Sequence, residues 1–240
     1  MPTEPMASAP LSPALRLAGV RFRWTRGAPV TLAIDALEVA RGERVFIQGP
    51  SGSGKSTLLA LVGGVTVPES GQVEVLGTAL STLPGAARDR FRADHVGFVF
   101  QMFNLIPYLP LVDNVALPCH FSARRRARAV ESGGSVADEA RRLLGRLGLE
   151  DEARRDRPVT ALSVGQQQRV AAARALIGAP EIVIADEPTS ALDADHREAF
   201  VQLLFEECAR HGITLLFVSH DAALAPGFDR TLRLSEVNRP

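Results

Sequence analysis

The stretch GPSGSGKST at residues 49–57 constrains this chain more than any other part of its sequence. It follows the apolar run GERVFIQ (42–48) and precedes TLLALVGG, an order that predicts a strand, a loop and a helix. Residues Gly49 to Ser56 match G-x-x-x-x-G-K-[ST], in which glycines let the backbone approach oxygen atoms and successive N–H groups surround an anion. The pattern therefore predicts a phosphate-binding loop.

The basic residues of the chain point to the same loop. Of the 27 lysines and arginines, Lys55 is the only lysine. An ammonium is a compact point charge, whereas a planar guanidinium would not fit inside a loop wrapped around phosphates. We therefore expect Lys55 to reach the β- and γ-phosphates and the Ser56 hydroxyl to hold Mg²⁺. The residues expected to contact the nucleotide are Gly49, Pro50, Ser51, Gly52, Ser53, Gly54, Lys55, Ser56 and Thr57.

Three further apolar runs end in polar residues. They are HVGFVF (95–100), EIVIA (181–185) and ITLLFVS (213–219). Their continuous apolar character is typical of parallel strands covered on both faces, and helices predicted between them favour an α/β sheet. Because ligands bind beyond the carboxyl ends of such strands, the residues that follow the runs should converge on the phosphate-binding loop. These residues are Gln101, Asp186, Glu187 and His220.

The chemistry of these four side chains suits a bound nucleotide. Asp186 is a candidate partner of Mg²⁺, directly or through water, and Glu187 can accept a proton from an attacking water or orient it. Gln101 can ligate the metal or position that water, and His220 can donate to the γ-phosphate. A lone glutamine or histidine at a strand end is more often a surface or capping residue. All four residues are expected at the same sheet edge as the phosphate-binding loop, and this shared position favours a nucleotide-binding site.

The composition limits the other readings. A length of 240 residues suits one domain with a sizeable core, and a net charge of zero favours neither nucleic acid nor an anionic membrane as a partner. The longest nearly apolar run is far too short to span a membrane, and the first 14 residues lack the features of a signal peptide. They predict a loose tail on a cytosolic chain. We expect Cys119 and Cys208 to be free buried thiols, since a zinc site at Cys119-His120 would need a second ligand pair.

A second candidate for an anion cradle is LSVGQQQR at 162–169. Ser163 and Gln166 have the spacing of a capping box at a helix start, and Gly178 and Pro180 predict where that helix stops. Backbone N–H groups at a helix start attract anions, although an ordinary capped helix explains the same residues.

The ordered set of motifs resembles the nucleotide-binding subunit of an ABC transporter over residues 15–235. GPSGSGKST resembles the Walker A loop, IVIADEP the Walker B strand, FVFQ the Q-loop, LSVGQQQR the signature, SALD the D-loop and SHD the H-loop. The resemblance implies an α/β P-loop NTPase fold of ABC type: a mainly parallel core sheet flanked by helices, an N-terminal antiparallel part and an inserted helical subdomain. The implied boundaries are one domain at 15–240, with a core at 15–101 and 166–240 and the helical subdomain at 102–165.

The resemblance also implies how the two cradles work. In this family two subunits pack head to tail, and each ATP lies between the Walker A loop of one and the signature of the other. ATP and Mg²⁺ are the implied cofactors, with Glu187, His220 and Gln101 as catalytic residues and Ser56, Gln101 and Asp186 around the metal. The implied contacts with the partner's ATP are Ser163, Val164, Gly165 and Gln166. Asp193 of the D-loop either contacts the partner subunit or caps a helix.

One aromatic residue, Trp24, and one aliphatic residue, Val164, also bear on how the nucleotide would be bound. Trp24 resembles the aromatic residue that stacks on adenine, with Phe22 the weaker candidate and a core tryptophan the alternative. Val164 departs from the family, which usually has glycine there. If Val164 has an ordinary helical φ the change costs little, and if it does not, closure of the pair is weakened.

In the family, the helical insertion docks a membrane permease. MFNLIPYL (102–109) offers Phe103, Leu105 and Tyr108 as exposed contacts, whereas the arginine run reads as a solvated face. The members of that run are Arg124, Arg125, Arg126 and Arg128. We expect the permease to be a separate chain, with this subunit peripheral to it on the cytoplasmic side of the inner or plasma membrane and paired with a second copy.

One stretch of the sequence also indicates which group of ABC transporter ATPases this chain resembles. FQMFNLIPYLPLVDNVALP resembles the lipoprotein-releasing and macrolide-exporting ATPases, whose partners extract hydrophobic cargo or transmit motion across the membrane. Two alternatives stay open at this point: a weakly active regulatory ABC ATPase, and a soluble ABC ATPase that takes no part in transport.

Overall fold

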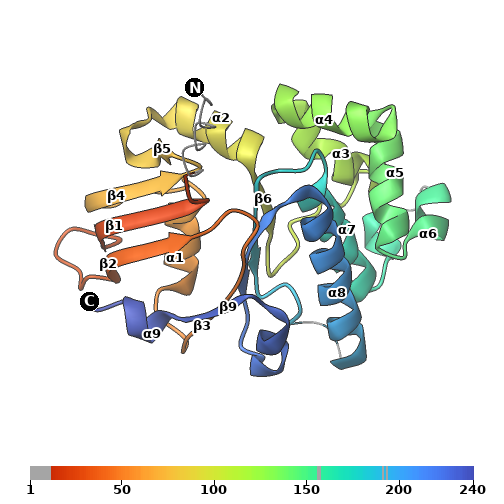
Figure 1. The fold of residues 1–240 in the computed structure, drawn as a ribbon. Coiled ribbons are helices and arrows are strands. Elements are labelled where there is room, and N and C mark those ends of the chain that lie inside the picture. The colour runs from red at the N-terminus through yellow and green to blue at the C-terminus, as the bar shows by residue number, and fades with distance from the viewer. Residues whose placement is uncertain (1–11, 156–157, 191, 193) are drawn as a thin grey trace, which may run out of the picture.

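The structure is a computed structural model that describes residues 12–155, 158–190, 192 and 194–240. These residues form two β-sheets with helices around them (Figure 1). An antiparallel sheet has the order β2-β1-β4-β5, made of β1 (Leu15–Phe22), β2 (Leu32–Val39), β4 (Ser70–Val75) and β5 (Thr78–Ala79). A parallel sheet has the order β6-β7-β8-β3-β9, made of β3 (Arg44–Gln48), β6 (Val96–Val99), β7 (Ile182–Asp186), β8 (Thr214–Val218) and β9 (Arg230–Arg233).

The helices account for most of the remaining described chain. They are α1 (Lys55–Val62), α2 (Gly85–His95), α3 (Leu111–Phe121), α4 (Ala123–Gly133), α5 (Val136–Arg146), α6 (Glu150–Arg154), α7 (Val164–Leu176), α8 (Ala194–His211) and α9 (Leu234–Val237). Short 3-10 turns lie at Leu80–Thr82, Val159–Ala161 and Ala222–Gly227. No helix within the described ranges has both the length and the apolar character required to cross a membrane.

All four apolar runs that the sequence marks as strands lie in the parallel sheet. Val99 of β6 pairs with Ala185 of β7, and Asp186 pairs with Val218 of β8. β8 in turn pairs with β3 through Ile47, so the carboxyl ends of the four strands share one edge. The parallel α/β core and the separate antiparallel sheet confirm the predicted fold class.

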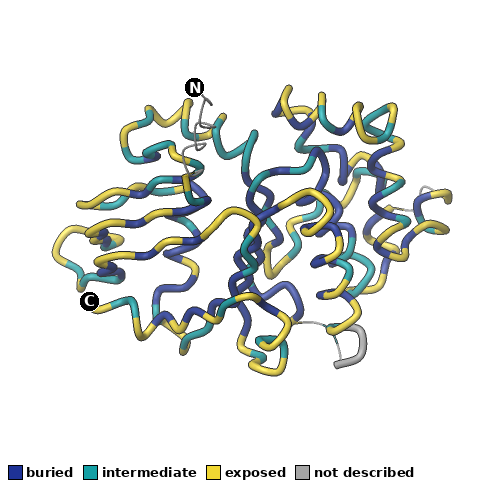
Figure 2. Tube along the Cα trace, viewed as in Figure 1, coloured by how far each residue is buried: buried dark blue, intermediate teal, exposed yellow. Residues whose placement is uncertain are grey.

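Alternation along β3 separates two hydrophobic cores. Val45 and Ile47 pack in a cluster with α1, whereas Phe46 packs in a cluster with α7 and α8. Since neighbouring side chains of a strand point to opposite faces, α1 and α7 cover opposite faces of the parallel sheet. Figure 2 shows the continuous buried chain through the strands at the centre of the molecule.

Helices α3 to α6 join one of these cores rather than forming an isolated unit. Val115 of α3 and Leu143 of α5 are buried in the same cluster as Phe46. The division into a core and a helical subdomain at 102–165 therefore stays a proposal. At the other end, residues 1–11 of the expected tail lie outside the described residues. Ala14 is fully buried and accepts the N–H of Leu76 at 2.9 Å, so the packed chain begins before residue 15.

The expectation of a solvated arginine face on α4 is wrong for Arg125, whereas Arg124 and Arg126 are exposed. Arg125 is 2% exposed, and its guanidinium donates to the carbonyls of Ile177 at 2.8 Å and Ala175 at 2.7 Å. Those carbonyls lie at the end of α7, where a helix leaves acceptors without internal partners. Burial lowers the pKa of Arg125 to about 10. Arg125 therefore fastens α4 to the end of α7.

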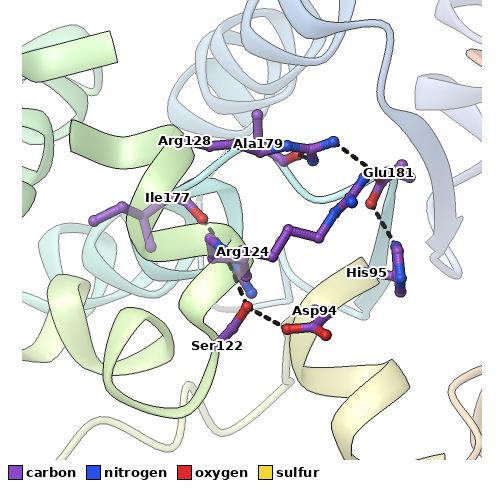
Figure 3. A network of polar contacts seen from close by, with 9 residues as sticks. Asp94, His95, Ser122, Arg124, Arg128, Ile177, Ala179 and Glu181 are labelled. Atoms are coloured by element: carbon purple, nitrogen blue, oxygen red, sulfur yellow. Dashed lines mark hydrogen bonds and ion pairs between the residues drawn. The ribbon is translucent and has the colours of Figure 1, made fainter. Parts of the chain in front are cut away.

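Two further arginines of the same run reach Glu181 (Figure 3). Arg124 and Arg128 lie 2.5 and 2.8 Å from its Oε1, and His95 lies 2.9 Å from its Oε2. Burial alone would raise the pKa of the Glu181 carboxyl, but hydrogen bonds from these three residues hold that pKa below its usual range. The carboxylate thus links α2, α4 and the segment that enters β7.

Candidate nucleotide-binding site

The phosphate-binding loop turns tightly between β3 and α1. Gly54 is the N-cap of α1 and has a φ of 99°, and Gly52 has a φ of 78°. A Cβ on Gly54 would lie 2.8 Å from Leu32 Cδ2 and 3.2 Å from the carbonyl of Thr31. Both the backbone angle and the lack of space require glycine at residue 54. No side chain caps the start of α1, so its backbone N–H groups can face an anion.

Lys55 lies within the curve of this loop. Its side chain is largely buried, and its ammonium donates to the carbonyls of Gly49 at 2.7 Å and Pro50 at 3.0 Å. A cation held by carbonyl oxygens along the loop is placed to meet a negatively charged group there. The sole lysine therefore lies where the sequence places it.

Ser56 and Asp186 form an oxygen pair across the loop. The Ser56 hydroxyl donates to Asp186 Oδ2 at 3.2 Å. Burial raises the pKa of the Asp186 carboxyl, while the bond from Ser56 opposes that shift. Mg²⁺ is commonly held by one or two carboxylates, with water and substrate phosphates as its other ligands. The pair fits that donor set, although the described residues contain no cluster of three or more His, Cys, Asp or Glu that could hold a metal.

Glu187 has an unusual backbone and a polar neighbour. Its φ is 47°, and its N–H donates to the carbonyl of Val218 on the adjacent strand at 3.0 Å. Its Oε1 lies 3.0 Å from Nε2 of His220, and the His220 N–H donates to its Oε2 at 3.4 Å. Burial raises the pKa of the Glu187 carboxyl, with His220 opposing the shift. A non-glycine residue at positive φ is strained, and such strain concentrates at functional sites.

Gln101 lies at the same edge of the sheet. It follows β6, whose Val99 pairs with Ala185, so it comes two residues beyond a strand that neighbours β7. The residue is exposed and lies in a turn in which the Phe103 N–H donates to the Phe100 carbonyl at 2.9 Å. The fold therefore brings the ends of β6, β7 and β8 to the loop that follows β3.

Trp24 lies beside the phosphate-binding loop. Its side chain is 62% exposed, and its indole N–H donates to Thr57 Oγ1 at 3.3 Å. It meets Phe22 edge to face at 5.1 Å, and Phe22 is itself buried. Trp24 and the glycine-rich loop line one surface hollow, which includes Gly52 and Ser53. The alternative of a core tryptophan is therefore wrong, and Phe22 has no free face to offer.

The second cradle begins α7. The Ser163 hydroxyl accepts from the Gln166 N–H at 3.3 Å, and Gln166 Oε1 accepts from the Ser163 N–H at 2.9 Å, which completes the capping box. Val164 is the first helical residue, is half exposed and is not among the residues with positive φ. Because α1 and α7 cover opposite faces of the sheet, the two cradles belong to different surfaces. Gly165 follows on the same turn, whereas Asp193 lies outside the described residues.

The expectation that Phe103, Leu105 and Tyr108 are all exposed is wrong for Phe103 and Leu105. Tyr108 is 84% exposed and Met102 is 80% exposed, whereas Phe103 and Leu105 are half-buried and pack against the core. Beside this segment a groove runs between α2 and α3. Its lining includes Phe98, Phe100, Asn104, Leu117, Phe121 and Arg174.

Two residues near the site gave no signal in the sequence. Asn238 donates to the carbonyls of Thr31 at 3.0 Å and Ser53 at 3.1 Å, and so supports the phosphate-binding loop from a position almost two hundred residues away. Arg197 pairs with Asp221, next to His220, and donates to the carbonyl of Leu192 at 2.9 Å. Single polar residues become informative only when the fold brings their distant partners to them.

Comparisons with known proteins agree with this geometry. A family model described as ABC transporter matches residues 33–190. An uncharacterized ABC transporter ATP-binding protein, YbbA of Escherichia coli K12, is 45% identical over 198 residues, 82% of this chain and 83% of that protein. The lipoprotein-releasing system ATP-binding protein LolD of Anaeromyxobacter dehalogenans is 42% identical over 231 residues, 95% of this chain and 93% of that protein.

One further relative and two solved structures are also similar to this chain. The macrolide export ATP-binding/permease protein MacB of Rhodopirellula baltica is 37% identical over 92% of this chain, which is 32% of that protein. The dimeric structure of MJ0796, a bacterial ABC transporter cassette, has a TM-score of 0.76 and 37% identity, and covers 94% of this chain and 97% of that chain. A dimeric post-hydrolysis state of the same cassette bound to ADP and Pi has a TM-score of 0.75 and 36% identity, over 91% of this chain and 93% of that one.

Proposed function

The chain belongs to the ABC transporter family of ATP-binding ATPases, and on that premise we propose that it drives a separate membrane permease by pairing with a second copy. The observation that carries the proposal is the meeting of Lys55, the Ser56–Asp186 pair and the Glu187–His220 pair at one sheet edge. These groups could bind, orient and cleave a nucleoside triphosphate.

In the proposed reaction the loop holds ATP while the strand ends act on its terminal phosphate. The backbone N–H groups at the start of α1 and the Lys55 ammonium bind the phosphates. Glu187 accepts the proton of the water that attacks the γ-phosphorus, the bond from that phosphorus to the bridging oxygen breaks, and ADP leaves. The His220 backbone N–H holds the Glu187 carboxylate at Oε2, which leaves the His220 imidazole to donate to the γ-phosphate. Ser56, Asp186 and Gln101 would hold Mg²⁺, which would neutralise charge on the phosphate oxygens.

In the proposed complex the adenine base would lie against Trp24. The exposed Trp24 ring lies over the start of α1 and shares a hollow with the loop glycines. An exposed aromatic face beside a phosphate-binding loop is suited to stacking on adenine.

The second cradle supports the pairing. Ser163, Val164 and Gln166 begin a helix on the face of the sheet opposite α1, so they are poorly placed to serve the subunit's own loop. In a head-to-tail pair they would contact the nucleotide of the partner subunit. The dimeric arrangement of the similar MJ0796 cassette supports this assembly.

The permease side of the proposal rests on exposed apolar groups. Phe121 lines the groove between α2 and α3 and is 72% exposed, and the 102–109 segment, which contributes Asn104 to that groove, exposes Met102 and Tyr108 by 80% and 84%. Large apolar side chains gathered on one surface are typical of a protein interface. Docking there would hold the subunit against the cytoplasmic side of a membrane. Similarity to LolD and MacB supports a permease that extracts or exports hydrophobic cargo, or one that transmits motion across the membrane.

Trapping the closed pair tests the proposal. Glu187→Gln should bind ATP, hydrolyse it slowly and elute as a dimer in size-exclusion chromatography with ATP and Mg²⁺. The double variant Glu187→Gln/Lys55→Ala is the matched control and should elute as a monomer under the same conditions. A monomer of Glu187→Gln at saturating ATP would contradict the shared site in the isolated subunit.

A further inference from the structure

Arg174 occupies an unusual place at the far end of the helix that begins with Ser163. It is 8% exposed, and burial lowers the pKa of its guanidinium. It donates to the carbonyl of Asn104 at 2.6 Å and to that of Phe103 at 2.5 Å. Both of these acceptors are main-chain groups, and both belong to the turn that carries Gln101.

The turn itself is in a conformation that needs support. Phe103 has a φ of 59° and Asn104 a φ of 51°, so two consecutive residues with side chains lie in the left-handed region. A left-handed backbone conformation costs free energy for a residue with a side chain, so it persists only where contacts with the surrounding structure hold it. The two parallel donors of the Arg174 fork hold both carbonyls at once, and an arginine has the planar geometry for this task. Arg174 therefore fixes the exit of the turn.

A direct backbone contact ties the same helix to the entrance of the turn. Gly97 lies in β6, the strand that leads to Gln101, and a Cβ there would lie 2.2 Å from the carbonyl of Ala175. The end of α7 thus presses on β6 on one side of Gln101 and, through Arg174, holds the chain on the other side. Ser163 caps the uninterrupted helix Val164–Leu176 to which Arg174 belongs, so a rigid-body shift of α7 that moves its Ser163 end moves Arg174 as well.

We infer that Arg174 is a positioning residue that couples the Ser163 end of α7 to the placement of Gln101. The inference rests on the proposed function, because it assumes that Gln101 acts on the bound nucleotide. A subunit whose Ser163 end has engaged the partner's nucleotide would then hold its own Gln101 in the working position. Hydrolysis in the two sites of the pair would be linked through two copies of α7.

The structure offers a matched control in Arg125. It is also buried, and it also donates to carbonyls at the end of α7, those of Ala175, Ile177 and Arg174 itself, so its removal loosens the same helix end but leaves the Arg174 side chain in place. Its fork does not reach Phe103 or Asn104, so Arg125→Met removes a comparable buried guanidinium without releasing the turn.

The first measurement follows the turn directly. Amide hydrogen exchange of a peptide that includes residues 101–104 should be at least about tenfold faster in Arg174→Met than in the parent protein, because the carbonyl anchors are lost. Arg125→Met should stay within about twofold of the parent in that peptide. Equal acceleration in both variants would overturn the inference, since the turn would then depend only on general stability.

The second measurement is a double-mutant cycle on ATP hydrolysis in the purified full-length chain. Arg174→Met should keep the ATP affinity within about twofold and lower kcat by roughly tenfold to a hundredfold, the scale expected for a misplaced group. In the Gln101→Ala background the same change should have little further effect. Arg174→Lys keeps the charge but not the fork, so it provides a milder folded variant that should show the same pattern with a smaller loss.

The outcomes separate the inference from the function on which it rests. If Gln101→Ala lowers kcat and Arg174→Met adds its full loss on top, the coupling is wrong while the role of Gln101 stands. If Gln101→Ala leaves kcat unchanged, the proposed role of Gln101 fails and the inference fails with it.

Discussion

The starts of α1 and α7 solve the same problem in different ways. At α1 the N-cap is Gly54 at positive φ and no side chain caps the helix, whereas at α7 Ser163 and Gln166 satisfy each other's backbone N–H groups. The first start is therefore open to a ligand and depends on glycine. The second is complete without one, which explains how it accommodates Val164. In the proposed function the chemistry lies on the α1 side, and the α7 side would supply a prebuilt surface for a partner.

The largest expected effect tests where the chemistry lies. Glu187→Gln should lower turnover by roughly 10²–10⁴-fold because the amide cannot accept the proton of the attacking water. Steady-state phosphate release at saturating ATP measures the change. Nearly normal turnover would move the base away from the α1 edge and remove the contrast between the two helix starts.

Lys55→Arg tests how closely the α1 cradle is fitted. We expect ATP affinity to fall by at least about tenfold, because the planar guanidinium cannot take the place of a point charge held by the carbonyls of Gly49 and Pro50. Trp24 fluorescence provides the titration signal, since its indole lies against Thr57. An unchanged dissociation constant would contradict the assignment of this loop.

The pH dependence of turnover provides a second test of Glu187, because acid protonates this carboxylate progressively. Burial raises the pKa of that carboxyl, so its protonated form accumulates at a higher pH than for an ordinary glutamate. Turnover should therefore decline as the pH falls through the raised pKa, reaching about tenfold per pH unit below it. The residual turnover of Glu187→Gln should lack the part of this decline that Glu187 causes and keep only the part that protonation of the half-buried Asp186 contributes. A profile that stays flat down to the ordinary glutamate range would contradict the raised pKa.

Ser163→Ala measures the capping box at α7. Loss of the cap should lower the free energy of unfolding by about 1 kcal/mol, followed by urea denaturation. Ser135→Ala is the matched control, because Ser135 caps α5 in the same way by accepting from the Asp138 N–H. Both variants should lose similar stability, and only Ser163→Ala should also slow hydrolysis. Identical turnover in the two would mean that the α7 start is merely structural.

Val164→Gly should have the smallest effect. Because Val164 already has negative φ at the first helical position, its removal should change turnover of the assembled complex by less than about tenfold, or 1.4 kcal/mol. A slight loss of stability should accompany the added backbone freedom. A hundredfold gain in ATPase rate would instead identify a restrained subunit and favour the regulatory alternative.

The sequence carries the strongly local features of this molecule. The phosphate-binding loop, the strand ends at Gln101 and Asp186, and the Ser163 capping box each depend on residues within a few positions of one another. Their physical rules are local, so pattern and spacing were enough to predict them. The parallel sheet followed because four apolar runs all required burial on both faces.

The features that the sequence did not reveal depend on distant partners. A run of arginines does not indicate that Arg125 should be buried, because its acceptors are carbonyls some fifty residues further along. Arg174 and Asn238 likewise bind main-chain groups that only the fold brings near them. Every residue has a main-chain carbonyl, so the amino-acid sequence does not indicate which carbonyl will accept a hydrogen bond from a distant side chain.

The single lysine has a practical consequence for chemical labelling. Amine-directed reagents modify lysine side chains and the α-amino group, so Lys55 is the only side chain of this protein that they can acylate. It lies within the curve of the phosphate-binding loop, and a nucleotide held there would cover it. The mass increment at Lys55 after a brief exposure to such a reagent would therefore record the occupancy of the loop, even in a mixture where turnover cannot be measured.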